Sequence, residues 1–286
     1  MRTLKTVEEI RRFSRSRKAE GHRVALVPTM GYLHEGHLSL VREGRRRASC
    51  VLASIFVNPI QFGPREDLDR YPRDLPRDSA LLEAEGVDAL FAPEVEEMYP
   101  RGFATRVTVE GPLTEGLCGA RRPGHFSGVA TVVTKLFAAC EPDLALFGQK
   151  DAQQAAVIRR FTKDLNLPVE IVVCPIVREG DGLAMSSRNV YLSPEERRQA
   201  PVLFRSLKAA EALFAAGERR GEVLLDTVRR EMAGAPLATI DYVELVDAES
   251  LVPVERVEAP ALLALAAFFG STRLIDNTVL NPSPGA

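Results

Sequence analysis

The chain has 286 residues, 45% of them hydrophobic, which is enough material for a sizeable core and for two domains. Its formal net charge of −2 gives no reason to expect a nucleic acid or a membrane surface as partner. No stretch approaches the roughly 20 apolar residues of a membrane span, and the sequence starts without the apolar segment of a signal peptide. The four cysteines are widely separated in apolar surroundings, so we expect reduced core thiols in a cytoplasmic protein.

The first predicted elements are a helix, a strand and a second helix. Residues 6–9 have the pattern of a capping box, which predicts a helix from about residue 7 to residue 18. Residues 23–27 form an apolar run typical of a buried parallel strand, and we expect Pro28 to end it. The apolar spacing from Leu38 onward predicts the second helix, with arginines in its last turn, where cations suit the negative end of the dipole.

The connection between that strand and the second helix, residues 28–37, contains two of the four histidines. Its two glycines let a ligand approach the backbone, and His34 and His37, three positions apart, lie on one face at a helix start. Free N–H groups at a helix start bind anions, and imidazoles can add hydrogen bonds to phosphoryl oxygens. The pattern indicates a site for a phosphate chain. The alternative is an ordinary glycine-containing turn with two surface histidines.

The pattern of alternating strands and helices continues through the middle of the chain. Residues 50–57 are a second apolar run, and β, α, β within about thirty residues implies parallel strands with a right-handed crossover. Asn58 and Gln61 follow this run, at the carboxyl end of a strand, where ligands bind in open α/β sheets. The next predicted elements are a helix over 77–85, a strand over 89–92, and a strand or part of a hairpin over 106–109.

A basic segment precedes the next predicted helix. Arg121 and Arg122 stand just before a glycine-containing helix start, and the helix is expected from about residue 129 to residue 140. Two arginines in this position could hold a carboxylate or a phosphate. The alternative is a solvated basic loop.

A second strand-to-helix connection resembles the first in its arrangement. Residues 143–147 are a predicted buried strand, and residues 148–154 lead from it into a helix that extends to about residue 165. Only six of the 37 basic residues are lysine, so Lys150 in this tight connection is informative. A compact ammonium suits a place between phosphates, although a surface lysine is the ordinary explanation.

The last part of the chain begins with a strand over 169–174 and a loop over 175–189. Two glycines predict a mobile loop, and its Ser-Ser-Arg sequence supplies hydrogen-bond donors, so this loop could close over a triphosphate. Predicted elements then change to two helices, over 194–216 and 222–232, followed by strands over 240–245, 262–269 and 273–275. Helices followed by strands, without alternation, indicate a separate small α+β domain.

The predicted fold class is therefore α/β, a Rossmann-like parallel sheet flanked by helices, with a smaller C-terminal α+β domain. We expect the boundary between the two domains near residue 177. Four motifs, at residues 28–37, 56–62, 147–154 and 185–189, occur in the order typical of the pantothenate synthetase family, the pantoate–β-alanine ligases. This resemblance implies that residues 1–176 bind ATP and pantoate and that residues 177–286 form a lid. The His-x-Gly-His pattern also resembles the wider nucleotidyltransferase superfamily.

The resemblance covers nearly the whole chain and implies an activity. Members of the family condense D-pantoate with β-alanine through a pantoyl adenylate, and they release AMP and pyrophosphate. The implied partners are therefore ATP with Mg²⁺, D-pantoate and β-alanine, without nucleic acid or membrane, and the family suggests a homodimer through the first domain.

The resemblance also implies site residues. The positions that resemble ATP-contacting residues are Met30, Gly31, Tyr32, Leu33, His34, Glu35, Gly36, His37, Gly148, Gln149, Lys150, Asp151, Val177, Met185, Ser186, Ser187 and Arg188. Those that resemble the catalytic groups are His34, His37, Lys150 and Arg188, with His37 at the position of the family's proton donor. Those that resemble ligands of pantoate and β-alanine are Gln61, Gln154, Asn58 and Arg122.

One position departs from the family pattern. Gln149 stands where many members have Glu, which removes a charge beside Lys150 and Asp151. Because both of those residues are retained, we expect the change to tune ATP affinity without abolishing it.

Three other functions compete with the ligase. An adenylyltransferase would use the same nucleotide turn, but it needs no acyl substrate pocket, so Gln61 and Gln154 argue against it. A tRNA synthetase would need an anticodon-binding module or a basic face. A regulatory protein with an inactive site is the third alternative, and the intact His34, His37 and Lys150 argue against it.

Overall fold

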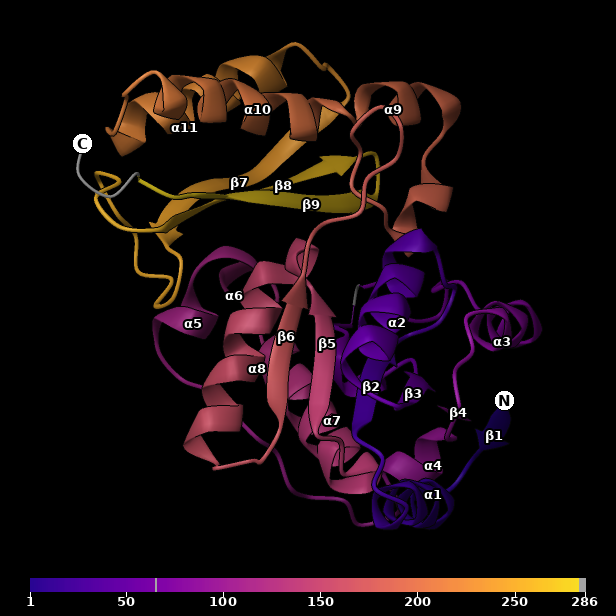
Figure 1. Cartoon of the computed structure of the whole chain (residues 1–286). Coiled ribbons are helices and arrows are strands. Elements are labelled where there is room, and N and C mark those ends of the chain that lie inside the picture. Colours follow the sequence, from indigo (N-terminus) through magenta and orange to yellow (C-terminus); the bar gives the residue numbers. More distant parts are fainter. Residues whose placement is uncertain (65, 283–286) are drawn as a thin grey trace. The chain divides into compact units, whose positions relative to one another are not determined.

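The computed structural model describes residues 1–64 and 66–282, and it divides the chain into two compact units (Figure 1). Unit 1 comprises Met1–Val109, Arg122–Gln149 and Val157–Pro175. Unit 2 comprises Glu110–Arg121, Lys150–Ala156 and Ile176–Ala286. Each unit has its own sheet and its own hydrophobic core, and each is described by itself.

The sheet of unit 1 has six parallel strands in the order β1-β4-β3-β2-β5-β6. The strands are β1 Arg2–Leu4, β2 Val24–Thr29, β3 Cys50–Ile55, β4 Ala89–Phe91, β5 Leu144–Gly148 and β6 Glu170–Cys174. The chain moves from β2 outward through β3 to β4, then returns to place β5 on the other side of β2. The strand order therefore reverses between β2 and β5, which is where open α/β sheets bind ligands.

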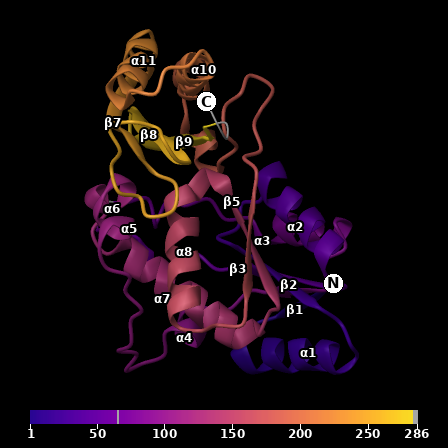
Figure 2. The same ribbon diagram turned by 60° about the vertical axis from the view of Figure 1, so that its left-hand side comes forward.

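Helices cover both faces of this sheet. They are α1 Val7–Ala19, α2 Glu35–Arg47, α3 Leu75–Ala84, α4 Val95–Met98, α7 His125–Cys140 and α8 Ala152–Asp164, with a short 3-10 turn η1 at Pro59–Gln61. Leu40 and Val41 of α2 pack in one cluster with Ala25 and Leu146 of the strands. Figure 2 shows α7 on the opposite side of the sheet from α2. The four inner strands, β4, β3, β2 and β5, are largely buried on both faces, as their apolar sequences predict, whereas the edge strands β1 and β6 are partly exposed.

Unit 2 is built on an antiparallel sheet of three strands in the order β7-β8-β9. Its elements are β7 Ala238–Asp247, β8 Ala261–Phe269, β9 Thr272–Leu280, α9 Pro194–Gln199, α10 Val202–Ala215, α11 Gly221–Ala233, the short helices α5 Pro112–Glu115 and α6 Leu117–Arg121, and the 3-10 turns η2 Gln149–Asp151, at its border, and η3 Ser187–Tyr191. Leu207 of α10 and Leu224 of α11 pack against Leu263 and Leu265 of β8. Figure 1 shows α10 and α11 along one face of this sheet.

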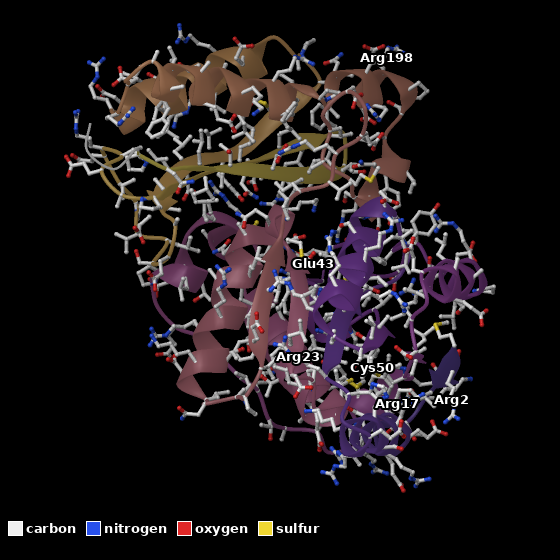
Figure 3. All side chains as sticks on the ribbon, in the orientation of Figure 1. Arg2, Arg17, Arg23, Glu43, Cys50 and Arg198 are labelled. Carbon is white, nitrogen blue, oxygen red and sulfur yellow. The ribbon has the colours of Figure 1, made fainter. Side chains whose placement is uncertain are left out.

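The predicted fold class is confirmed: a parallel sheet flanked by helices is followed by an α+β region with an antiparallel sheet. The capping box of α1 is also confirmed, since Thr6 accepts from the Glu9 N–H and the Glu9 carboxylate accepts from the Thr6 N–H. All four cysteines are buried and free of disulfide bonds, among them Cys50 at the start of β3 (Figure 3). In the part of the chain that the structure describes, no helix has the length and apolar character to cross a membrane.

Two predictions in unit 1 are wrong. Strand β2 does not end at Pro28 but at Thr29. The pairing of β2 with β5 stops at Leu26, so no ladder bond on that side needs an N–H at Pro28. Residues 106–109 form no strand, because the Val107 backbone bonds to side chains of α7 instead of to another strand: its N–H donates to Thr131 Oγ1 at 3.0 Å, and its carbonyl accepts from Ser127 Oγ at 3.4 Å.

Two predictions in unit 2 are also wrong. The helix expected over 194–216 is two helices, α9 and α10, because Pro201 has no N–H to continue the first. Strand β9 spans Thr272–Leu280 and is much longer than the expected 273–275. The extension includes Asp276 and Asn277, two polar residues that the sequence pattern does not assign to a buried strand, although both are buried.

Candidate functional site

The connection after β2 is a tight turn that requires glycine. Gly31 has a φ of +82°, and a Cβ at this position would lie 3.0 Å from Ile55 Cγ2 and 3.1 Å from Asp78 Oδ2. Thr29 supports the turn on its other side, since its Oγ1 accepts from the Gly31 N–H at 3.1 Å and donates to the Ser54 carbonyl at 2.8 Å. A left-handed backbone with so little space excludes other residues at 31.

A carboxylate from α3 holds the next two residues of this turn. Asp78 Oδ2 accepts from the Tyr32 N–H at 2.6 Å, and Asp78 Oδ1 accepts from the Leu33 N–H at 2.8 Å. Burial raises the pKa of the Asp78 carboxyl, and these two hydrogen bonds oppose that shift. Arg77 donates to the Leu33 carbonyl at 2.9 Å and lies 5.2 Å from the centre of the Tyr32 ring.

Neither Arg77 nor Asp78 is predicted as a site residue from the sequence. The signal that could have identified Asp78 is its spacing of four from the buried Leu82, which places a carboxylate on the inward face of a helix.

The two histidines of the turn cap helix α2 with their own rings. His34 Nδ1 accepts from the Gly36 N–H, and His37 Nδ1 accepts from the His34 N–H, each at 3.2 Å. The predicted free N–H groups at this helix start are therefore partly occupied. A neutral imidazole that accepts at Nδ1 has its proton on Nε2, so in both rings Nε2 is the nitrogen that donates. The ring centroids are 4.0 Å apart, which makes the two donors a pair suited to adjacent phosphoryl oxygens.

Three predicted site segments of unit 1 lie at one edge of its sheet. Residues 30–37 follow β2, Asn58 and Gln61 follow β3, and Gly148 and Gln149 lie at the end of β5. Because β3, β2 and β5 are adjacent and parallel, their carboxyl ends meet at the same edge. At Gly148, a Cβ would meet no atom within 4 Å, so packing does not require glycine there.

A chain of hydrogen bonds fixes the amide of Gln61. Asn58 Nδ2 donates to the Gly128 carbonyl at 3.1 Å and to Gln61 Oε1 at 2.9 Å, while Asn58 Oδ1 accepts from the Tyr99 hydroxyl at 2.7 Å. With its oxygen turned to Asn58, Gln61 directs its NH₂ group toward Met30 Sδ at 3.1 Å. Gln61 therefore presents a donor, which suits a carboxylate or hydroxyl oxygen of a substrate.

A second chain of bonds reaches the backbone of Gln61. Arg122 Nη1 donates to His125 Nε2 at 3.0 Å, so the proton of that ring is on Nδ1, which donates to the Gln61 carbonyl at 2.9 Å. Arg122 also binds both oxygens of Glu66, at 2.8 and 2.6 Å. Burial opposes ionisation of Glu66, but the guanidinium holds the pKa of its carboxyl below the usual value. Tyr99, Glu66 and His125 were not predicted as site residues; the sequence offers no motif for them.

In unit 2, the predicted residues of the second connection lie at the start of α8. Lys150 is largely buried, with its Nζ 3.6 Å from Asp151 Oδ2. Gln154 is half-buried. Its neighbour Gln153 is buried and has a structural role, since its amide binds the Leu113 and Gly116 carbonyls and the Cys118 N–H.

The remaining predicted residues of unit 2 belong to a hairpin over residues 177–185 and the turn that follows it. The Met185 N–H donates to the Val177 carbonyl at 3.0 Å, and the Glu179 N–H donates to the Leu183 carbonyl at 2.8 Å. Gly182 has a φ of +94°, and a Cβ there would overlap the Phe204 ring, so this glycine is required by packing. These bonds hold the hairpin together in the structure. The predicted mobility of the segment stays a prediction.

The turn after the hairpin positions the predicted serine and arginine donors. Ser186 caps the short helix Ser187–Tyr191, with its Oγ accepting from the Arg188 N–H at 3.3 Å. Asn189 Nδ2 ties this turn back to the hairpin through Glu179 Oε1 at 2.8 Å and the Ala184 carbonyl at 3.2 Å.

The described residues include no group of three His, Cys, Asp or Glu side chains that could hold a metal ion. The donors described above are ammonium, imidazole, guanidinium, hydroxyl and amide groups, which suit anions. Any divalent cation would therefore take most of its ligands from a bound anion such as a triphosphate.

Comparisons with known proteins agree with this chemistry. The family model for pantoate-β-alanine ligase matches residues 2–279. The pantothenate synthetase of Roseiflexus sp. (strain RS-1) is 62% identical over 280 residues, which are 98% of this chain and 99% of that protein. The crystal structure of pantothenate synthetase from Thermus thermophilus is similar with a TM-score of 0.94 and 52% identity, covering 99% of this chain and 100% of that one.

A more distant solved structure includes ligands. It is the pantoate-β-alanine ligase of Francisella tularensis in complex with β-γ ATP and β-alanine, with a TM-score of 0.79 and 31% identity, covering 98% of this chain and 97% of that one.

Proposed function

The chain belongs to the pantoate–β-alanine ligase family, and from that premise we propose how its own residues join pantoate to β-alanine with ATP. The reaction has two steps. The pantoate carboxylate attacks the α-phosphorus of ATP, which gives pantoyl adenylate and pyrophosphate. The β-alanine amine then attacks the acyl carbon, loses a proton, and displaces AMP.

The first step needs electrostatic help. A carboxylate is a poor acyl donor because its leaving group would be oxide, whereas a mixed anhydride with AMP has a good leaving group. Negative charge must be offset while the α-phosphorus is attacked and pyrophosphate leaves. Positioned cationic and N–H donors can do this without covalent chemistry of their own.

In unit 1, the proposal assigns phosphate contacts to the paired imidazoles. His34 and His37 each donate a hydrogen bond from Nε2 to a phosphoryl oxygen, with His37, at the position of the family's proton donor, as a catalytic group, and the backbone of residues 30–37 contacts the nucleotide. The Nδ1 caps on α2 support this assignment, because they fix the tautomer and the direction of both rings. Gly148 and Gln149, at the adjacent end of β5, complete the ATP-contacting set of this unit.

In unit 2, the proposal assigns a phosphate contact to the Lys150 ammonium and places Asp151 near the ribose or Mg²⁺. Val177 contacts adenine through its backbone, and residues 185–188 supply hydroxyl and guanidinium donors to the triphosphate, with Arg188 as a catalytic group. The capping of Ser187–Tyr191 by Ser186 supports this assignment, because it gives the turn a defined geometry.

The acyl substrate is assigned to the two glutamines. Gln61 and Gln154 hold pantoate, and Gln61 also adjoins the β-alanine site. The bonding pattern favours positioning roles for the other two candidates: Asn58 orients the Gln61 amide, and Arg122 acts on the Gln61 backbone through His125.

The proposal extends to cofactor, domains, assembly and location. Mg²⁺ enters as the counter-ion of the ATP phosphates. Residues 1–176 bind ATP and pantoate, and residues 177–286 act as a smaller lid domain. The protein is proposed to be cytoplasmic and to form a homodimer. Sedimentation of the purified chain tests the dimer.

One observation carries the proposal more than any other: two Nε2–H donors lie at a helix start beside the point where the strand order reverses. The test is the order of product release. Pyrophosphate release should require both ATP and pantoate, and AMP should appear only after β-alanine is added. Equal pyrophosphate release without pantoate, or transfer of AMP to a phosphorylated acceptor, would contradict the ligase assignment.

A further inference from the structure

Two adjacent polar residues lie in the interior of unit 2, outside every predicted motif. Asp276 and Asn277 are 1% and 4% exposed, in the middle of β9, where they pair with Leu265 and Ala264 of β8. Carboxylates and carboxamides are seldom so deeply buried unless they are fully bonded. Apolar residues could fill these two buried strand positions equally well. The role of Asp276 and Asn277 is therefore indicated by their hydrogen-bond partners.

Asp276 binds the base of the hairpin 177–185. Its two oxygens accept from Arg178 Nη1 at 2.6 Å and from Arg178 Nη2 at 2.9 Å, in a bidentate pair. The same guanidinium donates to the Gly182 carbonyl at 3.1 Å and lies 4.3 Å from the centre of the Phe204 ring. One buried carboxylate therefore fixes the arginine that closes the hairpin on itself.

Asn277 binds the other predicted ATP-contacting segment of unit 2. Its Nδ2 donates to the Lys150 carbonyl at 3.0 Å, and its N–H donates to Asp276 Oδ1 at 2.8 Å. Consecutive strand residues point to opposite faces of a sheet. The strand therefore holds the hairpin through one face and the Lys150 backbone through the other.

We propose that Asp276 and Asn277 are positioning residues for ATP, which hold Lys150 and the hairpin 177–185 in a fixed relation. This inference rests on the proposed function, because that function assigns ATP contacts to both segments. Neither residue touches ATP in this proposal. They act through the Lys150 main chain and through Arg178.

The test compares Asn277→Ala and Asn277→Asp with the wild-type chain. Alanine removes the donor to the Lys150 carbonyl, and aspartate keeps the shape but presents an oxygen there. Loss of one buried hydrogen bond predicts a decrease of about tenfold in kcat/KM for ATP, measured as pyrophosphate release in the presence of pantoate. The rate of AMP release on adding β-alanine to accumulated adenylate should change by less than about twofold.

The matched control is Thr278→Val, one residue further along the same strand. Thr278 Oγ1 donates to Glu211 Oε1 of α10 at 2.6 Å and bonds neither segment. This variant should lower the thermal unfolding midpoint as much as Asn277→Ala while retaining wild-type kinetics for ATP. Each variant is assayed at a temperature below its own unfolding midpoint. If only one of the two Asn277 variants folds, that variant alone is sufficient for the test.

Equal effects of the Asn277 and Thr278 variants on kcat/KM for ATP would overturn the inference, and so would equal losses in both half-reactions. Failure of the proposed function is distinguishable, because the wild-type chain would then release no pantoate-dependent pyrophosphate.

Discussion

The connections after β2 and after β5 have the same order of strand, glycine, polar cluster and helix, but the protein holds them with opposite chemistry. After β2, the buried carboxylate of Asp78 accepts from two backbone N–H groups. After β5, the buried carboxamide of Asn277 donates to one backbone carbonyl, that of Lys150. An ionised acceptor with two bonds stabilises a turn more strongly than a neutral donor with one. The first turn should therefore be the more rigid of the two.

The largest effects are expected from the side chains of each turn for which we propose contacts to ATP. His37→Ala and Lys150→Ala should each slow adenylation by roughly a hundredfold or more, the usual scale for one transition-state donor. Pyrophosphate release with saturating pantoate measures this rate. The controls are His22→Ala and Lys163→Ala, which remove a histidine and a lysine outside both turns. If His37→Ala or Lys150→Ala leaves the adenylation rate unchanged, that residue has no part in the mechanism. Only the other of the two turns would then contribute to adenylation.

The next largest effect is expected at Asp78, which holds the turn after β2 more strongly than Asn277 holds the turn after β5. Asp78→Asn keeps the shape of the side chain but places an NH₂ group where one backbone N–H needs an acceptor. The expected cost is about 2 kcal/mol in the free energy of unfolding, together with a higher KM for ATP, because hydrogen bonds to charged groups are the strong ones. Denaturant unfolding and initial rates measure the two quantities.

The control for Asp78 lies in the same helix. Asp74 caps α3 by accepting from the Arg77 N–H at 3.1 Å, so Asp74→Ala should cost about 1 kcal/mol without changing the KM for ATP. If the KM for ATP rises in proportion to the lost free energy of unfolding in both variants, Asp78 supports the fold as a whole and not the turn in particular.

The same comparison shows what the sequence could and could not predict. The proposed ATP contacts His34, His37 and Lys150 lie in contiguous motifs beside apolar runs, so the sequence alone can propose them, and its prediction that the two histidines follow a strand at a helix start is confirmed. The supports, Asp78 and Asn277, come from elements 45 and 127 positions away in the chain. A local sequence pattern cannot identify contacts between residues so far apart in the chain.

The errors in the predicted elements have a related cause. The extended part of β9 was missed because its buried Asp276 and Asn277 are polar, and their burial depends on Arg178 and Lys150, which belong to other elements. Binary patterning assumes that buried residues are apolar. It therefore fails where buried polar residues of a strand bond to other elements.

The smallest effect extends the comparison to the connection after β3, where the neutral hydroxyl of Tyr99 holds Asn58. Tyr99→Phe removes the donor to Asn58 Oδ1 and leaves that buried oxygen unpaired, so the Asn58 carboxamide holds the Gln61 amide less firmly. The expected result is a rise of about threefold in the KM for pantoate with an unchanged KM for ATP. The control is Tyr242→Phe, a buried tyrosine whose hydroxyl contacts Cys118 Sγ at 3.4 Å. If both variants alter the KM for pantoate alike, or if Tyr99→Phe raises the KM for ATP instead, the orientation of Gln61 does not depend on Tyr99 and the support of this third connection lies elsewhere.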